Sequence, residues 1–94
     1  LLAGSECEIE EFELSNDISL FETAKKRSLS ELGIGKKSGA KILAIKENEK
    51  LVTNPGGNFI LQPGQLLIAF GSKEQLNILN GLLGNLVVAV ELLK

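Results

Sequence analysis

Carboxylates are the side chains near the amino terminus whose type and spacing could do chemistry. Five glutamates crowd one predicted strand: Glu6, Glu8, Glu10, Glu11 and Glu13. Because residues two apart share a face of a strand, Glu6, Glu8 and Glu10 could present three carboxylates together. A hard divalent cation needs oxygen ligands that converge from several directions, whereas one strand supplies a row. We expect a solvated strand face; a cation site completed by a second chain, or acid–base catalysis, is the alternative.

The amino-acid composition excludes most other kinds of catalytic site. The 94 residues include no histidine and a single cysteine, Cys7. This excludes Ser–His and Cys–His nucleophiles and His-ligated metal sites within the chain, and one cysteine cannot build a thiolate metal site. The segment 33–37 (GIGKK) resembles a phosphate-binding loop only superficially, because the required spacing is missing. We predict that the chain is not an enzyme and that Cys7 is a small core residue.

The strand–turn–strand from Lys41 to Pro55 is the remaining candidate for binding. A short edge that is apolar on both faces invites pairing with a second copy of the chain. The walls of a groove between two copies would be Ile42, Leu43, Ile45 and Val52. Its rim would be Lys41, Lys46 and Asn54. Apolar walls with a few amide and ammonium donors suit a flat ring with attached phosphate. The alternative is that these side chains are ordinary core.

Periodicity predicts the strands that would position these residues. They are Glu6–Leu14, Ala40–Lys46, Leu51–Thr53, Leu66–Phe70 and 86–93, the last of which could instead be helix. In the first strand the apolar alternation breaks between Ile9 and Phe12. This predicts a β-bulge near Glu10-Glu11, unless the strand begins only at Glu11.

Both faces of the second strand are apolar, which predicts that both are covered. We expect Ile42 and Ala44 to share one face, and Leu43 and Ile45 to share the other. Core would cover one face, and a neighbouring chain or a helix would cover the other.

Capping and turn residues predict the helices and one tight turn. Ser28 and Glu31 form a capping box that opens a helix of little more than one turn, which Gly33 ends. Ser72 and Gln75 form a second capping box before a helix over Lys73–Leu83. Pro63-Gly64 is the preferred central pair of a type II turn, since glycine tolerates positive φ.

Length and charge bound the class of protein. Ninety-four residues fit one domain, and we expect 1–5 to be a linker remnant, 6–84 the domain, and 85–94 a C-terminal strand or extension. Because the chain has no methionine, we expect it to be a piece of something longer. The formal charge of −2, without an extended basic surface, argues against nucleic acid as a partner. No apolar run approaches the ~18 residues of a membrane span, so we expect no membrane insertion.

Several segments, in this order and spacing, resemble the C-terminal domain of the regulator-of-K+-conductance (RCK_C, or TrkA C-terminal) family. They are the turn SLSELGI, the strand AKILAIKEN, the Asn54-Pro55 stop, the segment PGQLLIAFG and the closing helix. The resemblance implies an α+β fold with a small mixed or antiparallel sheet of about five strands and two helices, which dimerises. Family members usually carry an acidic residue where this chain has Gln65, which we expect to be a turn contact.

The resemblance also implies a function. It suggests a cytoplasmic regulatory domain that senses a ligand and dimerises, attached to a potassium channel or transporter. Several family members bind cyclic di-AMP between two copies; the matching residues here are Ile42, Leu43, Asn54 and Pro55. The contact to phosphate falls to Lys41 or Lys46, where relatives often carry arginine.

Partners and alternatives follow from the same resemblance. It implies a homodimer, an upstream nucleotide-binding domain and a membrane pore or transporter subunit. Other relatives sense divalent cations, so a cation is a second possible ligand. The chain could instead be a pure assembly module, or the regulatory tail of an antiporter, an enzyme or a transcription regulator.

Overall fold

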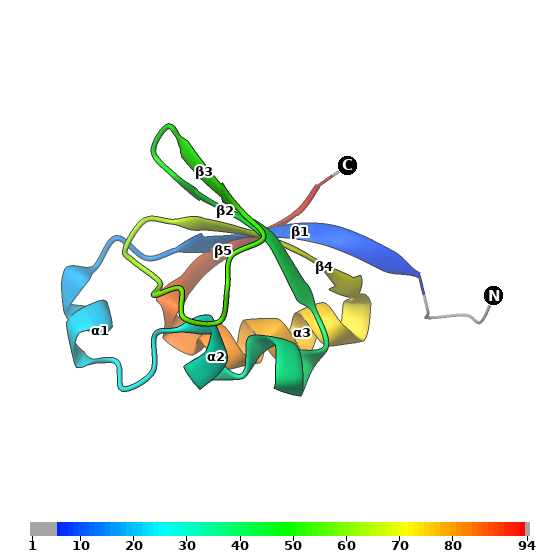
Figure 1. Cartoon of the computed structure of the whole chain (residues 1–94), viewed down its shortest axis with the longest axis horizontal. Coiled ribbons are helices and arrows are strands. Elements are labelled where there is room, and N and C mark those ends of the chain that lie inside the picture. The colour runs from blue at the N-terminus through cyan, green and yellow to red at the C-terminus, as the bar shows by residue number, and fades with distance from the viewer. Residues whose placement is uncertain (1–5, 94) are drawn as a thin grey trace.

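A computed structural model describes residues 6–93, which form one antiparallel sheet with helices on one face (Figure 1). The strands are β1 (Cys7–Leu14), β2 (Lys41–Glu47), β3 (Lys50–Thr53), β4 (Leu66–Ser72) and β5 (Val87–Leu93). The helices are α1 (Ile18–Thr23), α2 (Leu29–Leu32) and α3 (Lys73–Leu83), with a π-helical turn η1 (Ile34–Ser38) and a 3-10 turn η2 (Gly84–Leu86). The predicted fold class is confirmed, with α1 as an additional helix. The predicted linker remnant lies outside the described residues.

The strand order is β3-β2-β4-β1-β5, and one layer of core lies between this sheet and the helices. Buried side chains of β1, β2 and β4 meet the apolar stripe of α3. The largest contributors include Phe12, Leu14, Ile45, Leu67, Leu76 and Leu79. Removing such side chains from water is the main term that stabilises a domain of this size.

Both predicted capping boxes are present. The Ser28 hydroxyl accepts the Glu31 N–H at 3.0 Å, and the Glu31 carboxylate accepts the Ser28 N–H at 3.1 Å. Ser72 and Gln75 make the same reciprocal pair at the start of α3. Gly33 ends α2 with a left-handed φ of 73°, as predicted.

The turn before β4 is also as predicted. Gly64 has a φ of 78°, and a Cβ there would lie 2.6 Å from the Asn16 Oδ1 atom, so glycine is required twice over. The buried Gln65 side chain accepts the Gln62 N–H at 2.7 Å, which makes it the expected turn contact.

The bulge predicted near Glu10-Glu11 is wrong. β1 begins at Cys7 and pairs with β4 without interruption from Cys7 to Glu13. The alternation breaks because the apolar residues change faces: Phe12 faces the helices, whereas Cys7 and Ile9 lie on the opposite, open face. Cys7 is therefore exposed at the end of the strand, and the prediction that it is a core residue is wrong.

An irregularity in β2 also overturns the predicted assignment of its faces. The register against β4 shifts between Ile42 and Ala44, so Leu43 is an extra residue. Ile42 and Ile45 consequently share the core face, while Ala44 lies outside the core cluster. Ile42, Ala44 and Ile45 are all buried within one chain. Burial of this strand therefore does not require a second copy, and Ile45 cannot line a groove between copies.

The carboxyl-terminal segment is a strand, as favoured by its valines. β5 pairs antiparallel with β1 and forms one edge of the sheet. Among residues 6–93, no helix has the length and apolar character needed to cross a membrane.

Candidate ligand-binding pocket

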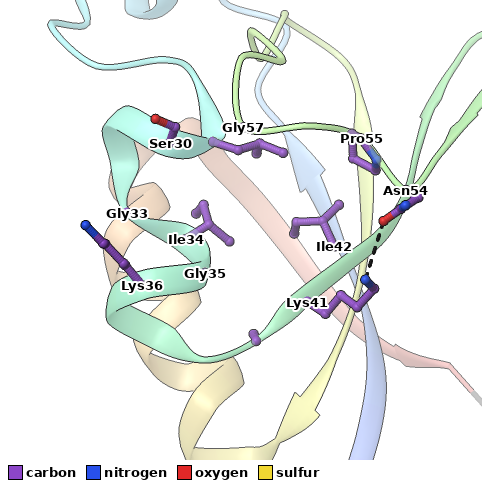
Figure 2. A pocket seen from close by; sticks show the side chains of 12 residues that line it. Ser30, Gly33, Ile34, Gly35, Lys36, Lys41, Ile42, Asn54, Pro55 and Gly57 are labelled. Carbon is purple, nitrogen blue, oxygen red and sulfur yellow. Dashed lines mark hydrogen bonds between the residues drawn. The ribbon is translucent and has the colours of Figure 1, made fainter.

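A pocket of about 460 Å³ opens between η1, the start of β2 and the loop that follows β3 (Figure 2). Four buried side chains form its apolar floor: Leu29, Ile34, Ala40 and Ile42. Ile34 and Ile42 come from opposite walls, as Figure 2 shows. The polar rim includes Ser30, Lys36, Lys41 and Asn54. An apolar floor under a few polar groups is the usual composition of a small-molecule site.

Backbone hydrogen bonds hold the loop wall of the pocket in place. The Asn54 N–H donates to the Leu43 carbonyl at 2.9 Å, and Asn54 adopts a left-handed φ of 48°. The Ser30 N–H donates to the Gly57 carbonyl at 2.9 Å. A Cβ on Gly57 would lie 3.1 Å from the Ser30 Cβ, so glycine permits this close approach between the loop and α2.

Four of the six predicted site residues line this pocket: Lys41, Ile42, Asn54 and Pro55. The Lys41 Nζ atom donates to the Asn54 Oδ1 atom at 3.4 Å (Figure 2). Leu43 and Lys46 do not line it: Leu43 is the half-buried extra residue of β2, and Lys46 is exposed beside Leu66 and Leu51. The Lys41 ammonium group and the Asn54 amide therefore lie together at the rim, which suits an anionic ligand that carries a polar ring.

Sequence reasoning missed the wall contributed by α2 and η1. This wall brings Leu29, Ser30, Gly33, Ile34, Gly35 and Lys36 to the pocket. The signal available in the sequence was a glycine in this segment, Gly35, because a residue without a side chain leaves space for a ligand. In the structure, a Cβ at Gly35 would meet no atom within 4 Å. The Lys36 side chain points away from Ile42 in Figure 2, so its ammonium group lies outside the cleft as drawn.

The acidic row of β1 is divided between the two faces of the sheet. Glu8 and Glu10 share the helix-side face with Phe12, while Glu11 and Glu13 lie on the open face. The pKa of Glu10 is raised, mainly by burial and to a lesser extent by the negative charge of Glu8. The positive charge of Lys73 partly opposes this increase. Glu6 precedes the strand. Within residues 6–93, no three Asp, Glu, His or Cys side chains gather in a way that could hold a metal ion.

The capping carboxylate of α2 has a shifted pKa. The Ser28 N–H and hydroxyl, followed by the Arg27 N–H, stabilise the ionised form and lower the pKa of Glu31 from its ordinary 4.5. Because folding lowers this pKa, ionised Glu31 stabilises the folded state fully above pH 4.5. That contribution is lost as the pH falls through the lowered value.

We expect the Glu31 carboxyl to titrate below pH 4.5 in the folded protein. Carbon-13 NMR of the side-chain carboxyl across an acid titration measures this midpoint directly. Ser28→Ala removes one of the groups that stabilise the carboxylate, so it should move the midpoint back toward 4.5. A midpoint at or above 4.5 in the unsubstituted chain contradicts a formed capping box in solution.

Comparison with known proteins places this geometry in a family. The TrkA-C domain family profile matches residues 24–84. Potassium channel protein 1 of Methanocaldococcus jannaschii is 44% identical over 48 residues, a stretch that covers 51% of this chain and 14% of that protein. The matched stretch therefore spans only about one seventh of that relative's length.

Solved structures of similar domains share the fold. The RCK C domain of the potassium transport protein KtrA, in complex with cyclic diadenosine monophosphate (c-di-AMP), has a TM-score of 0.64 and 28% identity, and the match covers 81% of this chain and 82% of that one. The RCK_C domain dimer of S. agalactiae BusR, also in complex with c-di-AMP, has the same TM-score at 20% identity, covering 83% and 91%. With the family profile matching well over half of its residues, the chain belongs to the TrkA-C domain family.

Proposed function

We propose that this domain is a cytoplasmic regulatory module of a longer potassium channel or transporter protein, and that it binds c-di-AMP in the pocket between η1 and β2. The proposal rests on one observation: the same apolar pocket is lined by Lys41, Ile42, Asn54 and Pro55. The KtrA RCK C domain, 28% identical, was solved in complex with c-di-AMP, and this supports the choice of ligand.

The chemistry of the pocket fits such a ligand. The floor around Ile34 and Ile42 offers apolar surface to an adenine ring, and the Asn54 amide can both donate and accept a hydrogen bond. The Lys41 ammonium group is exposed at the rim, where it can meet a phosphate. Lysine supplies a point charge without the planar fork of arginine, so this contact is less specific in geometry.

A second copy completes the proposed site. A cyclic dinucleotide has two bases and two phosphates, so two pockets related by a two-fold axis match its symmetry. Leu43 and Lys46 would meet the ligand only from the side of that second copy. The RCK_C domain of BusR, which shares the fold, is a dimer with c-di-AMP, which supports this arrangement.

Regulation then follows from differential affinity. A ligand held between two copies favours the relative orientation that it binds more tightly, and the attached upstream nucleotide-binding domains would transmit that bias to a membrane pore or transporter subunit. Coupling of this kind is typically worth about 1–3 kcal/mol.

Titration calorimetry with c-di-AMP tests the proposal. We expect saturable heat with one ligand per two chains, and no comparable heat with AMP or Ca²⁺. Lys41→Gln should weaken binding about tenfold or more, because a charge-assisted hydrogen bond is lost. Lys25→Gln, which changes an exposed lysine outside the pocket, is the matched control and should bind like the unsubstituted chain. Absence of heat with c-di-AMP contradicts the proposed ligand and favours a pure assembly module.

A further inference from the structure

The two edges of the sheet are protected to very different degrees. β3, at one edge, has only four residues, begins with Lys50 and is followed by Asn54-Pro55. β5, at the other edge, has seven residues, with Glu91 as its single charge and no proline or lysine. Short length, lysine and proline are the usual means of preventing an edge from pairing with another chain. β3 is short, begins with a lysine and is followed by a proline. β5 has none of these features, and its only irregularity is the extra residue Val88 opposite Glu13-Leu14.

β5 also exposes apolar side chains. The exposed fractions are 58% for Val88, 42% for Val90, 47% for Leu92 and 38% for Leu93. Val90 is paired with Phe12, so it lies on the helix-side face beyond the end of the core. Within residues 6–93, no strand pairs with the outer edge of β5. An edge of this kind with several exposed apolar side chains is suited to being covered by another strand.

We propose that β5 pairs antiparallel with β5 of a second copy, across a two-fold axis at Val90, so that two five-stranded sheets become one. In this register Val90 meets Val90, Val88 meets Leu92 of the second copy, and Ala89 meets Glu91 of the second copy. A two-fold contact of this kind requires a self-complementary surface, and this segment provides one.

Charge selects the register between the two copies. Like charges directly opposite each other in a sheet are destabilising, and β1 already places Glu11 opposite Glu91. An axis at Glu91 would add a second carboxylate pair, whereas an axis at Val90 places Glu91 against the small, neutral Ala89. The same axis pairs all seven residues of the strand, from Val87 against Leu93 inward.

This contact is separate from the ligand pocket. The pocket involves β2 and η1, and two strands, β4 and β1, lie between β2 and β5. Pairing through β5 therefore leaves the pocket open, and c-di-AMP binding can fail without affecting it. The reverse also holds, so calorimetry and the experiments below report on different interfaces.

Site-directed disulfide formation tests the proposed register. In a Cys7→Ser background, Val90→Cys should form a disulfide-linked dimer on mild oxidation without ligand. Facing residues of an antiparallel pair have Cα atoms about 4.5–5.5 Å apart, within the range of a disulfide. Leu51→Cys, on the opposite edge, is the matched control and should remain unlinked, although Leu51 is more exposed than Val90, at 56% against 42%. Cross-linking through Leu51→Cys, or none above background through Val90→Cys, overturns the proposal.

A charge at the axis provides a second test that needs no disulfide. Val90→Lys places two ammonium groups opposite each other, so in sedimentation equilibrium without c-di-AMP it should raise the dimer dissociation constant about tenfold or more. Leu51→Lys should leave it unchanged. Far-UV circular dichroism checks that both variants are folded. A folded Val90→Lys chain that dimerises as tightly as the unsubstituted chain contradicts pairing through β5.

Discussion

Replacing Gly35 with phenylalanine is expected to reduce c-di-AMP affinity about tenfold or more while leaving the domain folded. Gly35 lines the pocket, it does not have a positive φ, and a Cβ there would meet no atom within 4 Å. The new ring would therefore occupy ligand space in the 460 Å³ pocket without straining the backbone. Because Gly35 lies outside the buried core, we expect the free energy of unfolding to change by about 1 kcal/mol or less.

Gly81→Phe is the matched control for this substitution. Gly81 is exposed on α3, outside the pocket, and a Cβ there also meets no atom within 4 Å. Calorimetric titration of both variants with c-di-AMP separates occlusion from a general effect of adding an aromatic ring. Equal affinity for Gly35→Phe and the unsubstituted chain would place the ligand elsewhere.

Phe12→Ala is expected to lower the free energy of unfolding by about 3–5 kcal/mol. Phe12 is fully buried in β1, which is flanked by β4 and β5, and it belongs to the core cluster under the helices. Since small domains are stable by only about 5–15 kcal/mol, this loss removes a large part of the total.

Phe70→Ala is the control for this loss. Phe70 lies on the open face of β4, where it is 41% exposed, so its truncation should cost about 1 kcal/mol or less. Urea denaturation followed by far-UV circular dichroism measures both, since the chain has no tryptophan or tyrosine for fluorescence. Equal losses for the two variants would show that the open face is as thoroughly covered as the core.

Local features were the part that sequence reasoning predicted correctly. The capping boxes at Ser28 and Ser72 and the positive φ at Gly64 all appear in the structure. Each depends on hydrogen bonds or sterics between residues at most four apart, so the information lies within a few neighbouring side chains. The five strands were predicted for a similar reason, because apolar runs bounded by turn residues form a local pattern.

Errors arose wherever a residue's face depended on a partner strand. In β1, the interrupted alternation suggested a bulge, whereas the strand is regular and its apolar residues change sides. In β2, uninterrupted alternation suggested a regular strand, whereas the register against β4 shifts at Leu43. A sequence shows which residues are apolar, but the face that each one occupies is decided by pairing with a strand distant in the chain.

The pocket shows the same difference between features set by neighbouring residues and features set by distant ones. The residues Lys41, Ile42, Asn54 and Pro55 were recognisable from the sequence through their family resemblance, and all four line the hollow. The opposite wall, from Leu29 to Lys36, was not, because tertiary contacts bring it across from β2. Among them are the backbone hydrogen bonds from Ser30 to Gly57 and from Leu29 to Phe59, and the packing of Ile34 in the core. Local chemistry along the chain thus determined the elements and one side of the site. The enclosed space between two segments was decided by tertiary packing, since a cavity exists only where side chains distant in sequence leave a volume unfilled.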